Sequence, residues 1–367
     1  MSTTLTGRSF LGTFALVLLA IAGLFAGDMF LAKIDSVESQ TEATRLFKDA
    51  QRLMARGEYH KATDQLNDAL AIERENRDYL RTLAQAQLAD GKANAAEATL
   101  NQILSTDSTD GLANLLMGRV LVKEDRVEEA VSYFHRAIYG HWAQDTEGNR
   151  RRARFELIDL LAKRNAKGEL LAELLPILEE APHDLKTRTQ IGNLFLLAGS
   201  PERAEEVFRG IEHDAPSDER AYAGMGDAEF ARGNYRTAEK DFQTALRLAP
   251  DDQATRQKLD LCNQLLELDP TLRGLSLQDR YQRSVKLLEL ASTDMHQCSG
   301  DTVPADAQTL LDRASERLKT HVAGSRLSEA SEQNLDLAEQ LWQTRKKECK
   351  AAAKDNPLEL VLARMAQ

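Results

Sequence analysis

The feature that most constrains the fold of this chain is a residue pattern that returns every 34 residues over more than half of its 367-residue length. Each copy has a turn-forming residue followed by a small residue, a large apolar residue and a second apolar residue at fixed spacing. Six repeat starts follow, at residues 43, 77, 111, 151, 185 and 219. Periods of about 20 to 50 residues indicate stacked units that bury a shared core. The pattern therefore predicts a linear array over residues 43–252.

The spacing within each copy predicts two antiparallel helices joined by a tight turn. Glycine or asparagine at the turn tolerates the left-handed backbone that such turns need. Small residues let the two helices approach closely, and on the first helix they are Ala50, Ala84, Gly118, Gly192 and Gly226. Aromatic residues make up only 5% of the chain and no proline precedes Pro176, which disfavours an all-β protein. The predicted fold class is all-α.

These small residues, the turn residue, an aromatic such as Phe208 and a later proline such as Pro216 resemble the motif of the tetratricopeptide repeat family. The resemblance covers residues 43–252. It implies a right-handed superhelix, an α-solenoid of about six helix–turn–helix repeats, with the first helix of each repeat on the concave face. The fourth repeat departs from the motif, with Ile158 and Leu170 where the family has small residues. Residues 253–270 continue an apolar helical spacing and are predicted to cap the last repeat.

The resemblance also implies which side chains line the concave groove, because the family usually turns the same positions of each first helix towards it. At those positions this chain has Arg81, Gln85, Leu115, Arg119, Lys123, Asn193, Arg220, Asp227 and Phe230. Such a mixed groove suits a peptide or a helix of a partner protein. The family's clamp for C-terminal carboxylates is incomplete, since Asn193 matches it but Gly224 does not. The alternative is that each of these residues is an ordinary solvated helix residue.

One step of the array is irregular, because the interval from residue 111 to residue 151 is 40 residues, six more than the others. The extra residues fall within residues 139–149 and precede a run of arginines. Candidates for partner contact there are Trp142, Arg150, Arg151, Arg152 and Arg154. Longer loops in a regular array often serve binding, and arginines suit an acidic partner or anionic lipid headgroups. The alternative is a solvated helix start whose arginines pair with Glu147, Glu156 and Asp159.

The N-terminal segment contains nineteen consecutive residues without a charge, residues 9–27. As a helix they span roughly 28 Å, about one hydrocarbon thickness. Arg8 precedes the segment and acidic residues follow it, which places residues 1–8 in the cytoplasm and the rest across the membrane. The prediction is a single-pass anchor over residues 9–31 and a linker over residues 32–42. A signal peptide cleaved near residues 20–22 and a buried core helix remain alternatives.

Residues 271–367 lose the period but keep a helical spacing, and they are predicted to form a C-terminal helical bundle. They carry 14 basic and 14 acidic residues, so the net charge of −11 lies mainly on residues 41–270, which contain the array and carry 31 basic and 41 acidic residues. In an up–down–up bundle Cys298 and Cys349 reach the same end. A disulfide between them, in an oxidising compartment, would contribute roughly 3–4 kcal/mol. Two separate buried thiols are the alternative, and Cys262 is predicted to lie in the core.

Several activities are disfavoured by what the sequence lacks. There is no glycine-rich phosphate loop, no Cys-x-x-Cys, no His-Glu-x-x-His and no Gly-x-Ser-x-Gly, and the seven histidines are scattered. We therefore expect no enzyme, and no catalytic residue, metal, cofactor or small-molecule substrate. The acidic net charge also disfavours nucleic acid as a partner.

The predicted function is a membrane-anchored scaffold for protein–protein interactions, used in assembly or stabilisation of envelope or membrane protein complexes. For a bacterial source, the predicted location is the inner membrane, with the N-terminus in the cytoplasm and the repeats in the periplasm. One alternative is a structural subunit of a large membrane complex. Another is an accessory module for polysaccharide export, for which only Trp142 and Trp342 could provide broad aromatic platforms.

Overall fold

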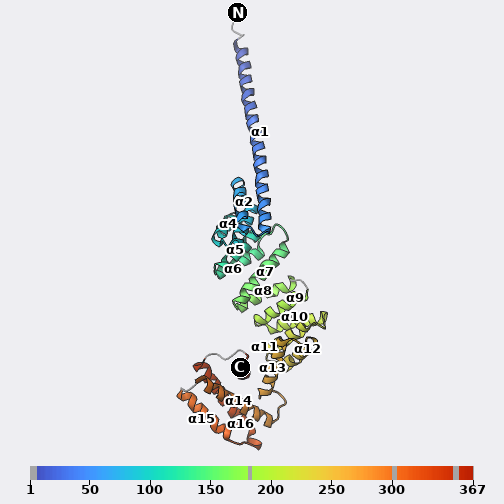
Figure 1. Ribbon diagram of the computed structural model, residues 1–367, viewed down its shortest axis with the longest axis vertical. Coiled ribbons are helices and arrows are strands. Elements are labelled where there is room, and N and C mark those ends of the chain that lie inside the picture. Colours follow the sequence, from blue (N-terminus) through green and yellow to red (C-terminus); the bar gives the residue numbers. More distant parts are fainter. Residues whose placement is uncertain (1–5, 181–183, 300–303, 350–354, 367) are drawn as a thin grey trace. The chain divides into compact units, whose positions relative to one another are not determined.

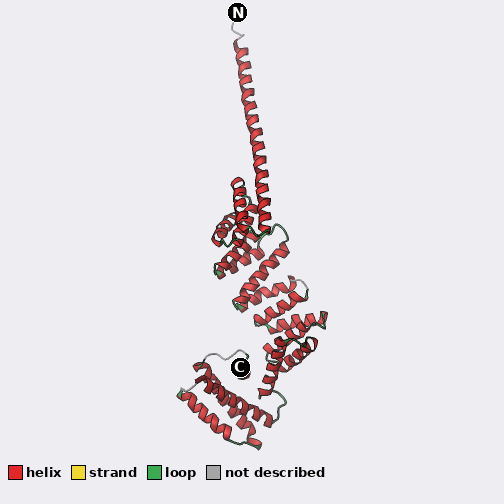
Figure 2. Cartoon of the chain, in the orientation of Figure 1, coloured by secondary structure: helices red, strands yellow, loops and turns green. Residues whose placement is uncertain are grey.

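A computed structural model describes residues 6–180, 184–299, 304–349 and 355–366, and seventeen α-helices account for most of them (Figures 1 and 2). The helices form an all-α repeat array, as the 34-residue period predicts. Within these residues the extended backbone pairing is confined to one isolated bridge, between Asp110 and His141. The chain divides into two compact units, residues 1–160 and residues 161–367.

The first unit contains a long N-terminal helix followed by helices that pair as helix–turn–helix repeats. Their bounds are α1 (Thr6–Ala55), α2 (Tyr59–Ile72), α3 (Arg77–Ala89), α4 (Ala93–Thr106), α5 (Gly111–Lys123), α6 (Val127–Tyr139) and α7 (Thr146–Lys163), most of which belongs to this unit. Helix α7 begins ahead of the repeat start predicted at residue 151, because the last residues of the insertion are themselves helical.

The second unit continues the repeats and ends in a bundle of longer helices. The repeat helices are α8 (Lys167–Glu180), α9 (Leu185–Leu197), α10 (Pro201–Asp214), α11 (Glu219–Ala231), α12 (Tyr235–Leu248) and α13 (Gln253–Leu268). The bundle consists of α14 (Leu277–Ser299), α15 (Ala305–Lys319), α16 (Leu327–Glu348) and α17 (Pro357–Met365), with a 3-10 turn at Gly324–Arg326.

The turn inside each repeat requires a left-handed residue. The backbone angle φ is positive at this position in all six repeats, at Gly57, Gly91, Asp125, Asn165, Gly199 and Gly233. Glycine adopts this conformation without a steric penalty, and asparagine and aspartate tolerate it better than other residues. The turn residues found from the sequence are therefore the residues that reverse the chain.

Close packing within the repeats explains why a small residue recurs on the first helix. A Cβ atom added at Gly192 would lie 2.6 Å from the ring of Phe208, and one at Gly226 would lie 2.5 Å from the ring of Phe242. Both rings are fully buried. Each phenylalanine thus fills the space that the glycine of the facing helix leaves open.

The core of the C-terminal bundle joins the end of the repeats within the second unit. Leu287 and Leu288 of α14, Leu341 of α16 and Val361 of α17 share one buried cluster with Tyr235 of α12. Helix α13 closes the last repeat, and its Cys262 is fully buried against Phe242, as predicted for a core cysteine.

The other two cysteines lie at adjacent helix ends of the bundle. Cys298, near the end of α14, is bonded to Cys349, which follows α16, and their Cα atoms are 6.0 Å apart. Burial raises the pKa of the Cys262 thiol to about 12, so this third cysteine stays protonated at neutral pH.

The predicted membrane anchor lies in the first half of α1. Most side chains between residues 6 and 34 are outside the described part of the chain, so the anchor falls largely on positions whose side chains are not described. Among the residues that were searched, none of the helices combines the length and the apolar character needed to cross a membrane. The described side chains of this half include Phe25 and Met29, which are exposed to about three quarters, at 74% and 78%.

Candidate functional site: a cleft in the first three repeats

A cleft of about 520 Å³ opens in the first unit, between the first helices of the repeats and the insertion. Its lining residues come from α1 and α3, from the start of α5, from the residues between α6 and α7, and from the first turns of α7. They are Phe47, Gln51, Asp78, Arg81, Thr82, Gln85, Asp110, Leu112, His141, Trp142, Ala143, Gln144, Asn149 and Arg152. Two predicted groove residues, Arg81 and Gln85, therefore share one cleft with two predicted insertion residues, Trp142 and Arg152.

The insertion forms a fixed wall of this cleft because its backbone is bonded to the preceding turn. The amide of His141 donates to the carbonyl of Thr109 at 2.7 Å, and the amide of Gly111 donates to the carbonyl of His141 at 2.8 Å. A Cβ atom added at Gly140 would lie 2.7 Å from the carbonyl oxygens of both Arg136 and Thr109. Only glycine allows the chain to pass this point, since backbone oxygens cannot move aside.

Trp142 fixes the insertion against the end of α6 and the start of α5. Its indole N–H donates to the carbonyl of Ala137 at 2.9 Å, and its ring covers Gly111, where a Cβ atom would lie 2.5 Å from the ring. The side chain is 7% exposed although it lines the cleft. The ring holds the insertion on the start of α5, and contact between Trp142 and a partner stays a prediction.

A buried carboxylate organises the floor of the cleft. Asp110, 1% exposed, caps α5 by accepting from the amide of Ala113 at 2.9 Å. It also accepts from Nε and Nη2 of Arg81 at 2.9 and 2.6 Å, while Nη1 of Arg81 donates to Asp78 at 2.9 Å. Burial opposes the charge on Arg81, but the hydrogen bonds to Asp110 and Asp78 outweigh it and raise the pKa of Arg81.

Other lining side chains keep their hydrogen-bonding groups available. Gln51, Gln85 and Gln144 make no side-chain hydrogen bond within the described residues. Arg152 is exposed and makes a single hydrogen bond there, from Nη1 to the amide oxygen of Asn149 at 3.3 Å. In this cleft Arg81, Asp78 and Asp110 are therefore paired with one another, whereas the glutamines and Arg152 have donors or acceptors left for a ligand.

Most of the other predicted groove residues bond to neighbouring segments. Arg119 of α5 forms two hydrogen bonds to Glu156 of α7, at 2.8 and 2.6 Å, which raise the pKa of Arg119. Lys123 donates to the carbonyl of Leu88 at 2.8 Å. These contacts join successive repeats, so the side chains serve the array itself.

In the second unit the predicted groove residues have similar roles. Asp227 pairs with Lys258 at 2.6 Å, and Arg220 forms an ion pair with Asp218 at the N-cap of α11. Phe230 packs on Tyr235, with ring centroids 5.2 Å apart, and contacts the core of the C-terminal bundle. Asn193 is exposed on α9.

The predictions that Leu115 and Arg154 contact a partner are wrong, because both side chains are buried. Leu115 is 1% exposed, since it lies on the core side of α5 and not on the groove. Arg154 is 4% exposed and has interactions within the protein. Of the other arginines, Arg150 reaches the carbonyl of Gly140 at 3.5 Å and Arg151 is half-buried and engaged within the protein.

The sequence analysis missed several residues of the cleft. Phe47, Gln51, Asp110, Leu112 and His141 line it without having been singled out. Asp110 could have been found, because an aspartate directly before a predicted helix start is a typical N-cap. His141 could not, because its position depends on how the insertion folds back onto the preceding turn.

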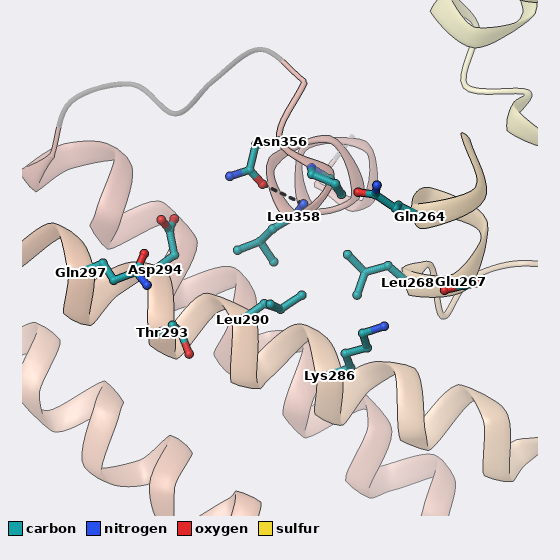
Figure 3. A pocket seen from close by; sticks show the side chains of 11 residues that line it. Gln264, Glu267, Leu268, Lys286, Leu290, Thr293, Asp294, Gln297, Asn356 and Leu358 are labelled. Carbon is teal, nitrogen blue, oxygen red and sulfur yellow. Dashed lines mark hydrogen bonds between the residues drawn. The ribbon is translucent and has the colours of Figure 1, made fainter. Parts of the chain in front are cut away.

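A second pocket, of about 380 Å³, lies in the C-terminal part of the second unit (Figure 3). Leu268 of α13, Leu290 of α14 and Leu358 of α17 converge on it from three helices. Several of its polar side chains bond to the protein itself. Asp294 pairs with Arg345 at 2.9 Å, and Asn356 accepts from the amide of Leu358 at 3.0 Å.

Neither unit offers an evident metal centre in its described residues, where no group of three or more His, Cys, Asp or Glu side chains could hold a metal ion. The site is defined by hydrogen-bonding and apolar groups on a helical repeat scaffold.

Two segments match known family models. Residues 53–120 match one tetratricopeptide repeat model, and residues 219–252 match another. The matched segments are similar to tetratricopeptide repeats, a class of repeat whose proteins are typically non-catalytic scaffolds that bind protein or peptide partners. A comparison with curated proteins finds no match.

Several solved structures are similar to this chain at low sequence identity. YrrB, a TPR protein with an unusual peptide-binding site, is 19% identical, with 52% of this chain and 96% of that chain covered and a TM-score of 0.42. PilW, a type IV pilus biogenesis factor, is 19% identical, and the match covers 59% of this chain and 98% of PilW with a TM-score of 0.40. The C-terminal part of a TPR repeat-containing protein from Cytophaga hutchinsonii is 12% identical, and the match covers 77% of this chain and 98% of that chain with a TM-score of 0.45.

Proposed function

We propose that this protein is a membrane-anchored scaffold that binds a segment of a partner protein in the cleft of its first three repeats. The observation that carries the proposal is the cleft itself, in which three glutamines and one arginine present unused hydrogen-bonding groups beside apolar side chains. Most side chains that line the cleft are polar, which suits hydrogen bonding to the backbone of a peptide segment. The rigid wall formed by the insertion supports this assignment.

We also propose that the first half of α1 anchors the protein in a bacterial inner membrane, with the repeats in the periplasm. The sequence supports this through its uncharged segment and the acidic residues that follow it. Exposed apolar side chains on one uninterrupted helix add support, since Phe14, Leu24 and Phe30 are 64–75% exposed. An oxidising compartment would also suit the pair Cys298 and Cys349. The scaffold would then serve assembly or stabilisation of envelope complexes.

Co-purification from detergent-extracted membranes tests the cleft. Gln85→Arg places a longer charged side chain in the cleft, and Gln102→Arg makes the same change on the exposed face of α4, outside it. We expect the wild type and Gln102→Arg to retain the same partners by mass spectrometry, and Gln85→Arg to lose at least one. Equal recovery with all three proteins would contradict the assignment of the cleft.

Two further results of the same work define the role and location. Substoichiometric partners support a scaffold, whereas one partner in fixed stoichiometry indicates a structural subunit of a membrane complex. Protease treatment of intact spheroplasts tests topology, with digestion of the repeats expected. Protection of the repeats would place them in the cytoplasm and overturn the proposed location.

A further inference from the structure

The charged side chains that line the cleft of the first unit divide into two groups. Arg81, Asp78 and Asp110 form a closed set, because every guanidinium nitrogen of Arg81 donates to one of the two carboxylates. Arg152 stands outside this set, and within the described residues its one partner is the neutral amide of Asn149. A guanidinium has five N–H donors in a planar fork that matches a carboxylate. Arg152 is therefore the one arginine lining the cleft that has no carboxylate partner within the described residues.

We propose that the cleft binds an extended internal segment of its partner protein through one acidic side chain, and that Arg152 recognises that carboxylate. This inference rests on the proposed function and specifies the chemistry of the partner. An arginine–carboxylate pair is shorter and stronger than a neutral hydrogen bond, and it fixes the orientation of the bound segment. The insertion, which places Arg152 at the cleft, therefore sets the specificity.

The glutamines determine the conformation of the bound segment. Gln51, Gln85 and Gln144 each offer a donor and an acceptor to the cleft. An extended segment has free backbone N–H and C=O groups to pair with them, whereas a helix has already used these groups internally. Phe47 and Leu112 line the same space and provide apolar contacts for neighbouring side chains.

The position of Asp78 limits the acidity of the segment. Its side chain is 73% exposed at the cleft and would repel a second carboxylate. The expected ligand therefore carries one acidic residue flanked by neutral ones, in contrast to a run of acidic residues. Because the pair is partly exposed, high salt weakens it.

Selection from a phage library of random dodecapeptides tests the proposal on the full-length chain in detergent micelles. The peptides are fused by their C-terminal ends, so no free terminal carboxylate is present. We expect peptides with a single Asp or Glu to be enriched about fivefold over their neutral counterparts, the effect of an exposed ion pair. With Arg152→Glu the preference should change to Lys or Arg, and Arg152→Lys should keep a reduced preference for acidic residues.

The control is Arg56→Glu, which makes the same charge change at an exposed arginine on the first unit outside the cleft. It should leave the acidic preference unchanged, and thermal unfolding should show that all variants fold as the wild type does. Acidic enrichment that persists in Arg152→Glu, or binding that appears only with free C-terminal carboxylates, would overturn the inference. A third outcome is that the wild type enriches peptides without preferring acidic residues and Gln85→Arg no longer enriches them. In that case the cleft binds peptides, and only the inference about Arg152 fails. If the wild type enriches no peptide, the proposed cleft function fails with it.

Discussion

The cleft of the first three repeats and the pocket of the C-terminal bundle are both lined by mixed side chains, but only the cleft has a wall formed by an insertion between two helices. In the C-terminal pocket Asp294 is paired with Arg345 and Thr293 donates to the carbonyl of Glu289 at 2.8 Å, while Gln264 and Gln297 make no side-chain hydrogen bond within the described residues. In the cleft, the glutamines and Arg152 leave most of their donors and acceptors unused. Polar groups that bond inward stabilise the fold, and those left open on a fixed wall can bind a partner.

The second difference between the two regions is how each is held together. The insertion is fixed by two backbone hydrogen bonds and the ring of Trp142. In the C-terminal bundle an ion pair adds to the apolar core and the disulfide, because Arg364 of α17 pairs with Asp269, which is fully buried at the end of α13. The two tryptophans of the chain lie one in each region, so fluorescence of single-tryptophan variants reports each separately.

The largest expected effect is on the C-terminal region. Arg364→Ala leaves the Asp269 carboxylate buried without its cation, which should lower the free energy of unfolding by about 3 kcal/mol. Denaturant unfolding followed by Trp342, whose indole N–H donates to Glu359 of α17 at 2.7 Å, measures the loss. Arg236→Ala, an exposed arginine on α12, is the matched control and should change stability little. Equal effects of the two variants would show that the ion pair does not hold α17.

A smaller effect is expected in the insertion. Gly140→Ala brings a Cβ atom against two backbone oxygens, so we expect a loss of about 2 kcal/mol, within the usual range for overpacking. Trp142 fluorescence should report the change, and peptide binding in the cleft should fall with it. Gly168→Ala is the control, since nothing lies within 4 Å of its added Cβ atom. A Gly140→Ala variant as stable as the wild type would mean that the insertion is not held as described.

The repeats could be predicted from the sequence because their determinants are local and periodic. The left-handed turn residues, the glycines that face phenylalanine rings and the burial of Cys262 all follow from residue type and spacing. The cleft could be predicted only in part. Arg81, Gln85 and Arg152 were found, but Leu115 was misplaced, because position in a repeat does not say which way a helix is rotated. The residues that the insertion contributes depend on its contacts with the turn at Thr109 to Gly111, which no pattern records.

The smallest expected effect concerns a half-buried carboxylate, Asp241, that lacks the pairing seen at Asp269. Burial, together with nearby Glu229 and Glu212, raises the pKa of Asp241 on α12 to about 6. The protonated form is favoured in the folded state, so the stability it contributes is complete below about pH 4 and is lost as the pH rises through 6.

Asp241→Asn removes this dependence. The variant should unfold with the same free energy as the wild type near pH 4 and be about 1–2 kcal/mol more stable at pH 7, the gain being limited by partial exposure to solvent. Urea unfolding across this pH range measures the difference. A variant less stable than the wild type at pH 7 would show that the ionised carboxylate has a stabilising partner.

The most direct test of the central claim is photo-crosslinking from within the cleft. A benzoylphenylalanine residue replaces Gln144, which is exposed on the insertion wall, or Gln102, which is exposed on α4 away from the cleft. After irradiation of cells, we expect a discrete adduct of one partner protein from position 144 and none of that mass from position 102. Adducts of equal yield from both positions, or an adduct from position 102 alone, would contradict the assignment of the cleft as the binding site.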